Sequence, residues 1–397
     1  MTRVVITGVG FVSSLALDAP GTWAAMLAGR CGLRPLTKLD LPLEPARLAG
    51  EVDLPPDEVP RHTTFGGRMA LRSLKELLAF GPDLSRLDPH RMGVFQGAGT
   101  TGLPSAEAYL EARLQGLRPI TAEPVLQTPN RVTDALAEAL GAEGPRSTVM
   151  NACSSSLLAL GQAWERIASG ELDLAVAGGA ESLCRTTYAG FSSLKAMDPN
   201  PCRPFSADRA GMNLGEGSAQ FLLEPLEHAR ARGADIFAEL VGYGASLDAH
   251  HPTAPHPEGE GAARALAMAL RVGRLNAEDI DLVSAHATAT PANDAAECLA
   301  IRRALGNAAD RVSLTATKAH FGHTLGAAGA VGTFAAVMAL KHQIVSPTLR
   351  LDTPDALCDL DCTPLHPKQR QVRAALVNAF AFGGNNLCLA LRRWEGM

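Results

Sequence analysis

One cysteine stands where its thiol could react. The segment "NACSSSLLALG" (151–161) follows a short strand-like run and leads into a helix-like stretch, so Cys153 lies where a strand turns into a helix. The positive end of a helix dipole stabilises a thiolate, and serines suit the first helical positions, where hydroxyls cap free N–H groups. On this segment alone, an exposed reactive thiolate and a small buried cysteine are equally good interpretations.

Three further loops carry groups that could act with a thiol, and each follows a strand-like run. They contain, in chain order, His286, Thr288, Thr290 and Glu297; Lys318, His320 and His323; and Phe382, Gly383 and Gly384. Polar groups that follow the carboxyl ends of strands gather at one edge of an α/β sheet, where active sites form. Each histidine alone is more often structural, but the joint pattern predicts a nucleophile with imidazole partners.

Strand-like runs alternate with helix-like segments along the chain, which predicts an α/β fold with buried sheets. The predicted strands are 3–7, 92–96, 173–178, 219–224, 281–285, 311–315 and 374–378, and the predicted helices include 155–169, 259–272, 292–305 and 325–341.

A faint internal repeat indicates two related halves. "STVMNACSSSLLALG" and "VSLTATKAHFGHTLGAAGAVG" both run from a strand through a polar turn into a helix of small residues, and they begin about 165 residues apart. No Pro/Ser-rich linker divides the chain. We therefore expect two duplicated halves, at residues 1–235 and 236–397, rather than two unrelated domains.

Composition and charge exclude several classes of protein. The 397 residues are 46% hydrophobic and 19% charged, with a net charge of −5, which is typical of a globular protein and gives no basic region for nucleic acid. The N-terminus does not resemble a signal peptide, so we expect a cytoplasmic protein. The apolar stretch 321–340 is rich in Gly and Ala, which predicts a buried helix rather than a membrane span.

The cysteine pattern argues against two other roles for Cys153. The eight cysteines are scattered with no CxxC pair, and no second cysteine or histidine lies within a few residues of Cys153. In a large chain without a secretory signal, reduced thiols are the expectation. We therefore predict neither a disulfide nor a metal site at Cys153.

A glycine-rich loop could be mistaken for a dinucleotide site. "VFQGAGTTG" places Gly97, Gly99 and Gly102 after a strand in the pattern G-x-G-x-x-G. Pro104 follows at once, and no second parallel strand ending in an acidic residue comes next. The loop is better interpreted as a tight exit from the strand, where backbone segments pass closely.

The motifs together resemble the β-ketoacyl-acyl carrier protein synthases, the condensing enzymes of fatty acid and polyketide synthesis in the thiolase-like superfamily. The resemblance runs from "VVITGVGFVSS" to "FGGNNLCLAL" and includes "CRPFSADRAGMNLGEGSAQFLLEPLEHARARGA". It implies a thiolase-like fold of five αβαβα layers built from the two halves. It also implies acyl carrier protein as partner, a homodimer or a heterodimer with a ketosynthase-like subunit, and no cofactor beyond the carrier's phosphopantetheine.

The resemblance assigns a role to each candidate residue. Cys153 would take the acyl group from the carrier thioester, and His286 and His323 would stabilise the enolate formed when malonyl thioester loses carbon dioxide. Lys318 and Glu297 would form an ion pair that orients these histidines. The remaining residues would form the oxyanion hole (backbone N–H of Cys153 and Phe382), line the pantetheine tunnel (Thr288, Thr290) and shape the acyl gate (Met212, Phe382, Gly383, Gly384). His320 would be structural or solvent-facing.

Two related activities and one unrelated function stay open at this stage. A thiolase-type acyltransferase would need a second cysteine near the C-terminal glycines, and a chain-length partner subunit would lack the nucleophile; a plain α/β binding module would use none of these groups in chemistry. Residues around the acyl pocket depart from the family's usual pattern, which leaves the acyl chain and the pathway open. These positions are Met212, Asn213, Ala287, Ala289, Ala381 and Asn385.

Overall fold

A sheet of ten hydrogen-bonded strands forms the centre of the molecule. The computed structural model describes residues 1–41, 47–55, 63–79, 81–118 and 128–396. In spatial order the strands are β11 (Ser313–Thr315), β10 (Ile280–Ser284), β14 (Ala374–Ala381), β15 (Asn385–Arg392), β9 (Ala238–Leu247), β1 (Val4–Val12), β8 (Gly217–Pro225), β6 (Leu174–Glu181), β4 (Met92–Gly97) and β5 (Arg146–Val149).

The two ends of this sheet repeat one topology. On one side β4 lies between its parallel neighbours β5 and β6, and the antiparallel strands β8 and β1 follow. On the other side β10 lies between parallel β11 and β14, and the antiparallel strands β15 and β9 follow. The halves join where Val4–Ile6 pairs with residues 238–240. The repeat agrees with the predicted duplication; the domain boundary at residue 235 stays a prediction.

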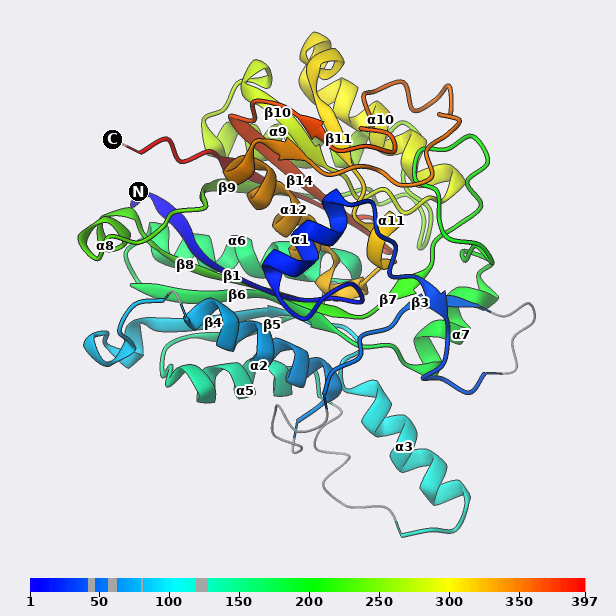
Figure 1. The fold of residues 1–397 in the computed structure, drawn as a ribbon, viewed down its shortest axis with the longest axis horizontal. Helices are drawn as coiled ribbons and strands as arrows, with labels where there is room; N and C mark the ends of the chain where they lie inside the picture. Colours follow the sequence, from blue (N-terminus) through cyan, green and yellow to red (C-terminus); the bar gives the residue numbers. More distant parts are fainter. Residues whose placement is uncertain (42–46, 56–62, 80, 119–127, 397) are drawn as a thin grey trace.

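Helices cover both faces of each half, which gives the layered arrangement visible in Figure 1. The outer helices are α2 (Phe65–Leu78) and α5 (Asn130–Leu140) on one side and α9 (Glu260–Gly273) and α10 (Pro291–Leu305) on the other. Between the halves lie α6 (Ser155–Ala168) and α12 (Ala328–His342). The order is therefore helix, strand, helix, strand, helix, as the five-layer expectation has it.

Shorter elements complete the chain. The other helices are α1 (Ala19–Leu27), α3 (Leu103–Leu114), α7 (Arg185–Ser193), α8 (Leu226–Ala231) and α11 (Lys318–Phe321). The 3-10 turns are η1 (Leu84–Arg86), η2 (Pro89–Arg91), η3 (Ala152–Ser154), η4 (Ala277–Asp279), η5 (Gly306–Arg311) and η6 (Leu325–Ala327). The small strands are β2 (Arg34–Pro35), β3 (Leu48–Gly50), β7 (Leu214–Gly215), β12 (Ile344–Val345) and β13 (Lys368–Gln369).

The apolar segment that begins with η6 and continues as α12 lies inside the protein. Among the described residues, only Leu325–His342 is helical, long and apolar enough to cross a membrane, and 89% of it is buried within the fold. Every residue from 328 to 340 is buried. A helix that is apolar on all sides is expected at the centre of a large core, so the prediction of a buried helix is confirmed.

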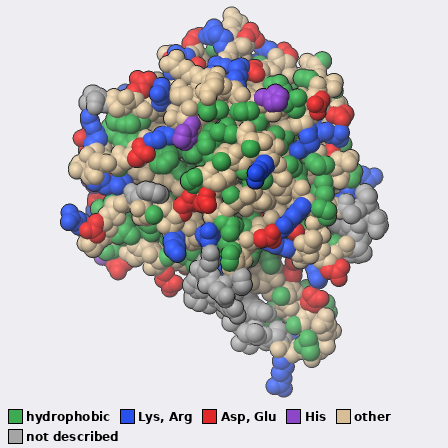
Figure 2. Space-filling model, viewed as in Figure 1, with side chains coloured by type: hydrophobic (Ala, Val, Ile, Leu, Met, Phe, Trp, Pro, Cys, Tyr) green, Lys and Arg blue, Asp and Glu red, His purple; other side chains and the backbone are tan. Residues whose placement is uncertain are grey.

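Acidic and basic side chains are mixed on the face shown in Figure 2, where no large area carries a single sign of charge. This distribution agrees with the small net charge of −5. Proteins that bind nucleic acid through the phosphate backbone present a basic face, and this side of the molecule has none.

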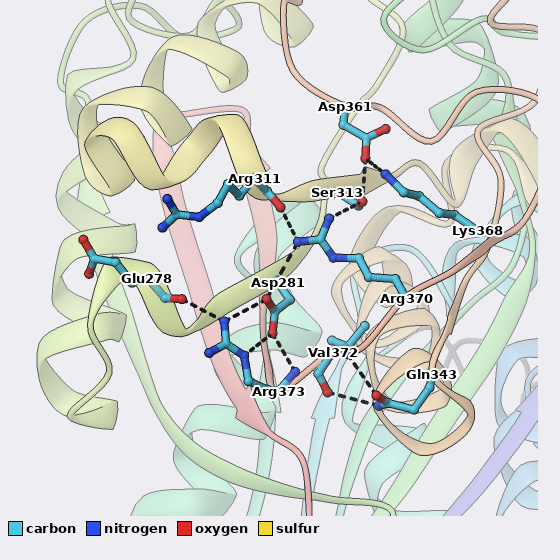
Figure 3. Close-up of polar contacts among 10 residues, drawn as sticks. All are labelled: Glu278, Asp281, Arg311, Ser313, Gln343, Asp361, Lys368, Arg370, Val372 and Arg373. Carbon is cyan, nitrogen blue, oxygen red and sulfur yellow. Dashed lines mark hydrogen bonds and ion pairs between the residues drawn. The ribbon is translucent and has the colours of Figure 1, made fainter.

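An ion-pair network fixes the ends of β10, β11 and β14 that lie away from the site described below (Figure 3). Asp281 accepts hydrogen bonds from the backbone N–H of Arg373 (2.8 Å) and from its Nε (2.9 Å). Arg370 lies 3.7 Å from the same carboxylate and donates to the hydroxyl of Ser313 (2.9 Å) and to the carbonyl of Arg311. The network therefore ties the segment before β14 to both neighbouring strands.

Replacing Asp281 should measurably destabilise the fold. Asp281→Ala leaves the backbone N–H of Arg373 without its acceptor and removes the carboxylate beside the partly buried Arg370, which costs about 1–3 kcal/mol of unfolding free energy. Glu171→Ala removes the exposed pair with Arg166, and exposed pairs contribute about 0–1 kcal/mol. Urea unfolding of both variants measures the difference, and equal losses would contradict a structural role for the network.

Candidate active site

The turn that carries Cys153 is strained, and the serines after it hold it in place. Ala152 has φ +47°, in the left-handed region that residues with side chains rarely adopt. The hydroxyls of Ser154 and Ser155 donate to the carbonyls of Asn151 (2.9 Å) and Ala152 (2.7 Å). The expectation that these two serines cap free N–H groups at the start of α6 is therefore wrong, because their hydroxyls bond back to the turn.

The Cys153 thiol is buried rather than exposed. Cys153 is only 7% accessible to solvent, and this burial raises the pKa of its thiol to about 11, although the nearby Lys318 cation favours the thiolate. At this pKa the resting thiol is protonated. Of the two interpretations that the segment left open, the exposed thiolate is therefore wrong, and the structure shows the buried cysteine. The backbone N–H groups of Cys153 and Phe382 also favour the charged sulfur; their role as an oxyanion hole stays a prediction.

His323 contacts the thiol directly. Its Nε2 lies 3.0 Å from the sulfur of Cys153, and its Nδ1 accepts a hydrogen bond from the backbone N–H of Leu325 (3.1 Å). Burial holds the pKa of His323 well below its usual value, so the ring is neutral. Because Nδ1 is an acceptor, the proton of the neutral ring is on Nε2. His323 thus presents a hydrogen-bond donor to the sulfur.

The loop that carries His286 is strained in two places. Ala287 and Ala289 have φ +41° and +61°. Two buried carboxylates on α10 hold this loop. Glu297 accepts the backbone N–H groups of His286 and Ala287, each at 2.8 Å, and Asp294 accepts that of Ala289 at 3.1 Å. Strained residues at a site persist only where the surrounding structure holds them, and these bonds supply that support.

Lys318 supports His286 without a direct ion pair to Glu297. Its Nζ donates to the carbonyl of His286 and lies 3.4 Å from Nδ1 of the same ring. No Lys318–Glu297 contact within 4 Å exists among the described residues, so the predicted ion pair is wrong: both groups bond to His286 itself. Lys318 has only donors, so Nδ1 of His286 is an acceptor and Nε2 carries its proton.

Both imidazoles and the thiol face one cavity of about 300 Å³. The rings of His286 and His323 lie 5.6 Å apart between centroids. The ring of Phe382 stacks on Phe191 at 5.6 Å across this cavity. The predicted tunnel and pocket residues that line the cavity are Thr288, Thr290, Met212 and Phe382. The hydroxyls of the two threonines bond to each other at 2.9 Å.

Two predicted gate residues lie in a turn rather than in the cavity wall. Gly383 and Gly384 have φ +84° and +78°. The N–H of Gly383 donates to the carbonyl of Pro252 (2.7 Å), and that of Gly384 donates to Ala381 (3.0 Å). Only glycine adopts two successive left-handed conformations without steric cost. The pair therefore shapes the turn that carries Phe382.

His320 is structural. It is completely buried, and its ring nitrogens each lie 2.9 Å from a backbone carbonyl, those of Arg30 and Pro347. The solvent-facing alternative is thus wrong. Asn378 and Phe191 were not predicted, since an amide at the end of a strand and an isolated aromatic ring resemble ordinary core residues. Asn378 donates to Glu297 (2.9 Å).

The whole chain matches one family. Residues 1–229 match "Beta-ketoacyl synthase, N-terminal domain" and residues 237–352 match "Beta-ketoacyl synthase, C-terminal domain". The chain is 38% identical, over 424 aligned positions that cover all of both proteins, to 3-oxoacyl-[acyl-carrier-protein] synthase 2 of Rhizobium meliloti.

Solved structures agree with this match. The ishigamide ketosynthase/chain length factor is 34% identical, with a TM-score of 0.94 over 99% of this chain and all of that chain. A type II polyketide ketosynthase in complex with its acyl-carrier protein is 27% identical, with a TM-score of 0.93 over the same shares. The fold, the paired halves and the relatives therefore agree: this chain belongs to the beta-ketoacyl synthase family.

Proposed function

We propose that Cys153 accepts an acyl group from acyl carrier protein, and that His286 and His323 then support decarboxylative condensation with a malonyl thioester. The protein is a β-ketoacyl-acyl carrier protein synthase, an acyltransferase of fatty acid or polyketide synthesis, like its relatives. The observation that supports these roles best is the meeting of the buried thiol with two neutral, buried imidazoles at one cavity, with Nε2 of His323 3.0 Å from the sulfur.

In the first step the sulfur of Cys153 attacks the carbonyl carbon of the acyl thioester. The carbon–sulfur bond to phosphopantetheine breaks, and the proton of the Cys153 thiol ends on the departing pantetheine thiol. The oxyanion formed on the way is stabilised by the backbone N–H groups of Cys153 and Phe382, which already face the sulfur.

In the second step a malonyl thioester enters and loses carbon dioxide. The electron pair of the broken carbon–carbon bond forms an enolate, whose oxygen accepts hydrogen bonds from Nε2–H of His286 and His323. The enolate carbon attacks the acyl carbonyl on Cys153, the carbon–sulfur bond breaks, and the sulfur takes up a proton. The products are a 3-oxoacyl thioester longer by two carbons, carbon dioxide and the free thiol. A dry site protects the enolate from water.

Partners and location follow from this chemistry. The acyl and malonyl groups arrive on the phosphopantetheine of acyl carrier protein, and the reaction needs no further cofactor. A second subunit, either a copy of this chain or a chain length factor, is the expected oligomeric partner, since one similar ketosynthase is described with such a factor. We assign the protein to the cytoplasm, where its eight free cysteines stay reduced.

The two related alternatives fit less well. A thiolase-type reaction needs a second reactive cysteine at the site, but Cys388 lies in the core of the C-terminal half, fully buried and outside the cavity lining. A chain-length subunit would lack the nucleophile, whereas Cys153 is present and contacts His323.

Cys153 should be the residue that is acylated. After mixing with acyl-carrier thioesters, intact mass and peptide mapping should place the acyl group on Cys153, and Cys153→Ala should abolish it. The alkylation rate of Cys153 by iodoacetamide should rise about tenfold per pH unit from pH 7 to 10, because a thiol with a pKa of about 11 is mostly protonated there. Acylation that survives Cys153→Ala, or an alkylation plateau near pH 8, would contradict the assignment.

The two imidazoles should matter for decarboxylation more than for acylation. Removing one preorganised donor to a developing oxyanion costs on the order of a hundred- to thousandfold in rate. His286→Ala and His323→Ala should therefore reduce carbon dioxide release by that factor while some acylation of Cys153 survives. His320→Gln serves as control: it should lower stability and leave both rates within about threefold. Loss of decarboxylation in His320→Gln alone would show that the histidines are misassigned.

Met212 should influence which acyl chains are accepted. It is 3% exposed and lines the same cavity as Cys153. Methionine is flexible and fills irregular space, so Met212→Phe should make the wall stiffer and change the ratio of kcat/KM between short and long acyl thioesters. Malonyl decarboxylation should stay within about threefold. An unchanged acyl-length profile would exclude this position as a determinant.

A further inference from the structure

A third buried carboxylate lies beside the active site and has no part in the steps above. Glu181, the last residue of β6, is completely buried. Its carboxylate accepts the backbone N–H groups of Gly99 (2.9 Å), Thr100 (2.8 Å) and Gly326 (3.1 Å), and the hydroxyl of Thr100 (3.0 Å). No cation lies within 4 Å of it in the part of the chain that the structure describes.

The donors to Glu181 come from both halves of the fold. Gly99 and Thr100 belong to the glycine-rich loop after β4, whose N–H groups therefore bind an internal carboxylate and not a phosphate. Gly326 belongs to η6, in the other half. A Cβ on Gly326 would lie 2.7 Å from Glu181 Oε2 and 3.1 Å from the backbone nitrogen of Gly99, so the loops approach this closely only with glycine there.

The residue before Gly326 links this contact to His323. Leu325 has φ +45°, a strained conformation that persists for a bulky residue only where its surroundings hold it. One hydrogen bond lies on each side of this strained residue. Its own N–H donates to Nδ1 of His323 (3.1 Å), and the next N–H, of Gly326, donates to Glu181. Glu181 thus holds the peptide bond after Leu325, and so fixes the neighbouring peptide bond whose N–H, that of Leu325, points at the ring.

We propose that Glu181 is a positioning residue for His323: by holding η6 it keeps the Leu325 N–H on Nδ1 and so keeps the ring proton on Nε2, facing Cys153. This proposal rests on the proposed role of His323 as an enolate donor. If the Leu325 N–H moved away, the neutral ring could carry its proton on Nδ1 and would then present a lone pair, not a donor, to the substrate.

A charged Glu181 is energetically costly at this place, which indicates that the fold needs a carboxylate there as hydrogen-bond acceptor. A carboxylate near Cys153 raises the pKa of that thiol, and burial raises the pKa of Glu181 itself to about 7. The first effect is unfavourable at a site that must form a sulfur anion, and the second shows that burial makes the charged form of Glu181 itself costly. A carboxylate, however, has no donor of its own and can accept three N–H groups that converge from two loops. Such an acceptor is what holds η6 against the loop after β4.

The test removes the contact from both sides and compares it with a matched carboxylate. Glu181→Ala removes the acceptor, and Gly326→Ala displaces η6 while Glu181 stays. Glu76→Ala is the control, because Glu76 also accepts two backbone N–H groups, those of Phe11 (2.9 Å) and Ala19 (2.7 Å), but contacts no active-site loop. Two quantities are measured: kcat and KM for decarboxylation of malonyl-acyl carrier protein, and the tautomer of His323.

The tautomer is measured by NMR on protein labelled with ¹⁵N-histidine, with His323→Asn to identify the signals. Wild-type His323 should show one neutral form protonated on Nε2. In Glu181→Ala and Gly326→Ala we expect a mixture that includes the Nδ1–H form. The value of kcat should fall by about a hundredfold, as misplacement by about 1 Å does, with KM changed less than threefold. Glu76→Ala should change neither quantity.

Several results would overturn the proposal. These are an unchanged tautomer or a kcat within threefold of wild type in both test variants, or an equal loss of kcat in Glu76→Ala. If Glu181→Ala does not fold, Gly326→Ala decides. Because the tautomer is measured without substrate, a wild-type protein that releases no carbon dioxide would contradict the proposed function, while the tautomer would still decide the role of Glu181.

Discussion

Exclusion of water from the reacting groups is the constraint on which the rest of this structure depends. Cys153, His286, His323 and Lys318 are all buried, and the first three line a cavity of about 300 Å³. Burial penalises every charged form, so the histidines are neutral and the thiol is protonated at rest. A neutral imidazole with its proton fixed on one nitrogen is a donor that needs no solvent. The site therefore works through fixed hydrogen bonds, and the fold must supply all of them from backbone and buried carboxylates.

That requirement explains where the strain lies. Ala152, Ala287, Ala289 and Leu325 all adopt the left-handed conformation, and each directly precedes, follows or supports a reacting side chain. Each such residue costs about 1–3 kcal/mol. Ala287, Ala289 and Leu325 point their backbone N–H groups at a carboxylate or an imidazole, and those bonds offset part of the cost because an unpaired buried N–H is itself expensive. The strain and the buried carboxylates are thus two parts of one arrangement.

The sequence predicted the identity of the reacting groups better than it predicted their protonation and contacts. Loops after strands identified Cys153, His286 and His323, because the direction of parallel strands decides which ends meet. The strands β9 and β15 were not predicted, since Gly242 and Gly244 interrupt one and Asn385 begins the other. The protonated thiol and the missing Lys318–Glu297 pair could not be predicted, because both depend on burial and on distances of a few ångströms that no local pattern encodes.

Close packing of the two halves finally sets the distance at which the chemistry occurs. Cys153 comes from the N-terminal half and His323 from the C-terminal half, yet their reacting atoms lie 3.0 Å apart. The helices behind them, α6 and α12, meet through a small residue: a Cβ on Gly329 would lie 2.5 Å from a methyl group of Leu157 and 3.0 Å from its backbone nitrogen. A larger side chain at position 329 would separate the segments that carry the sulfur and the imidazole. The Gly- and Ala-rich composition of 325–340, which resembles a membrane span by length alone, is thus what lets two duplicated halves share one active site.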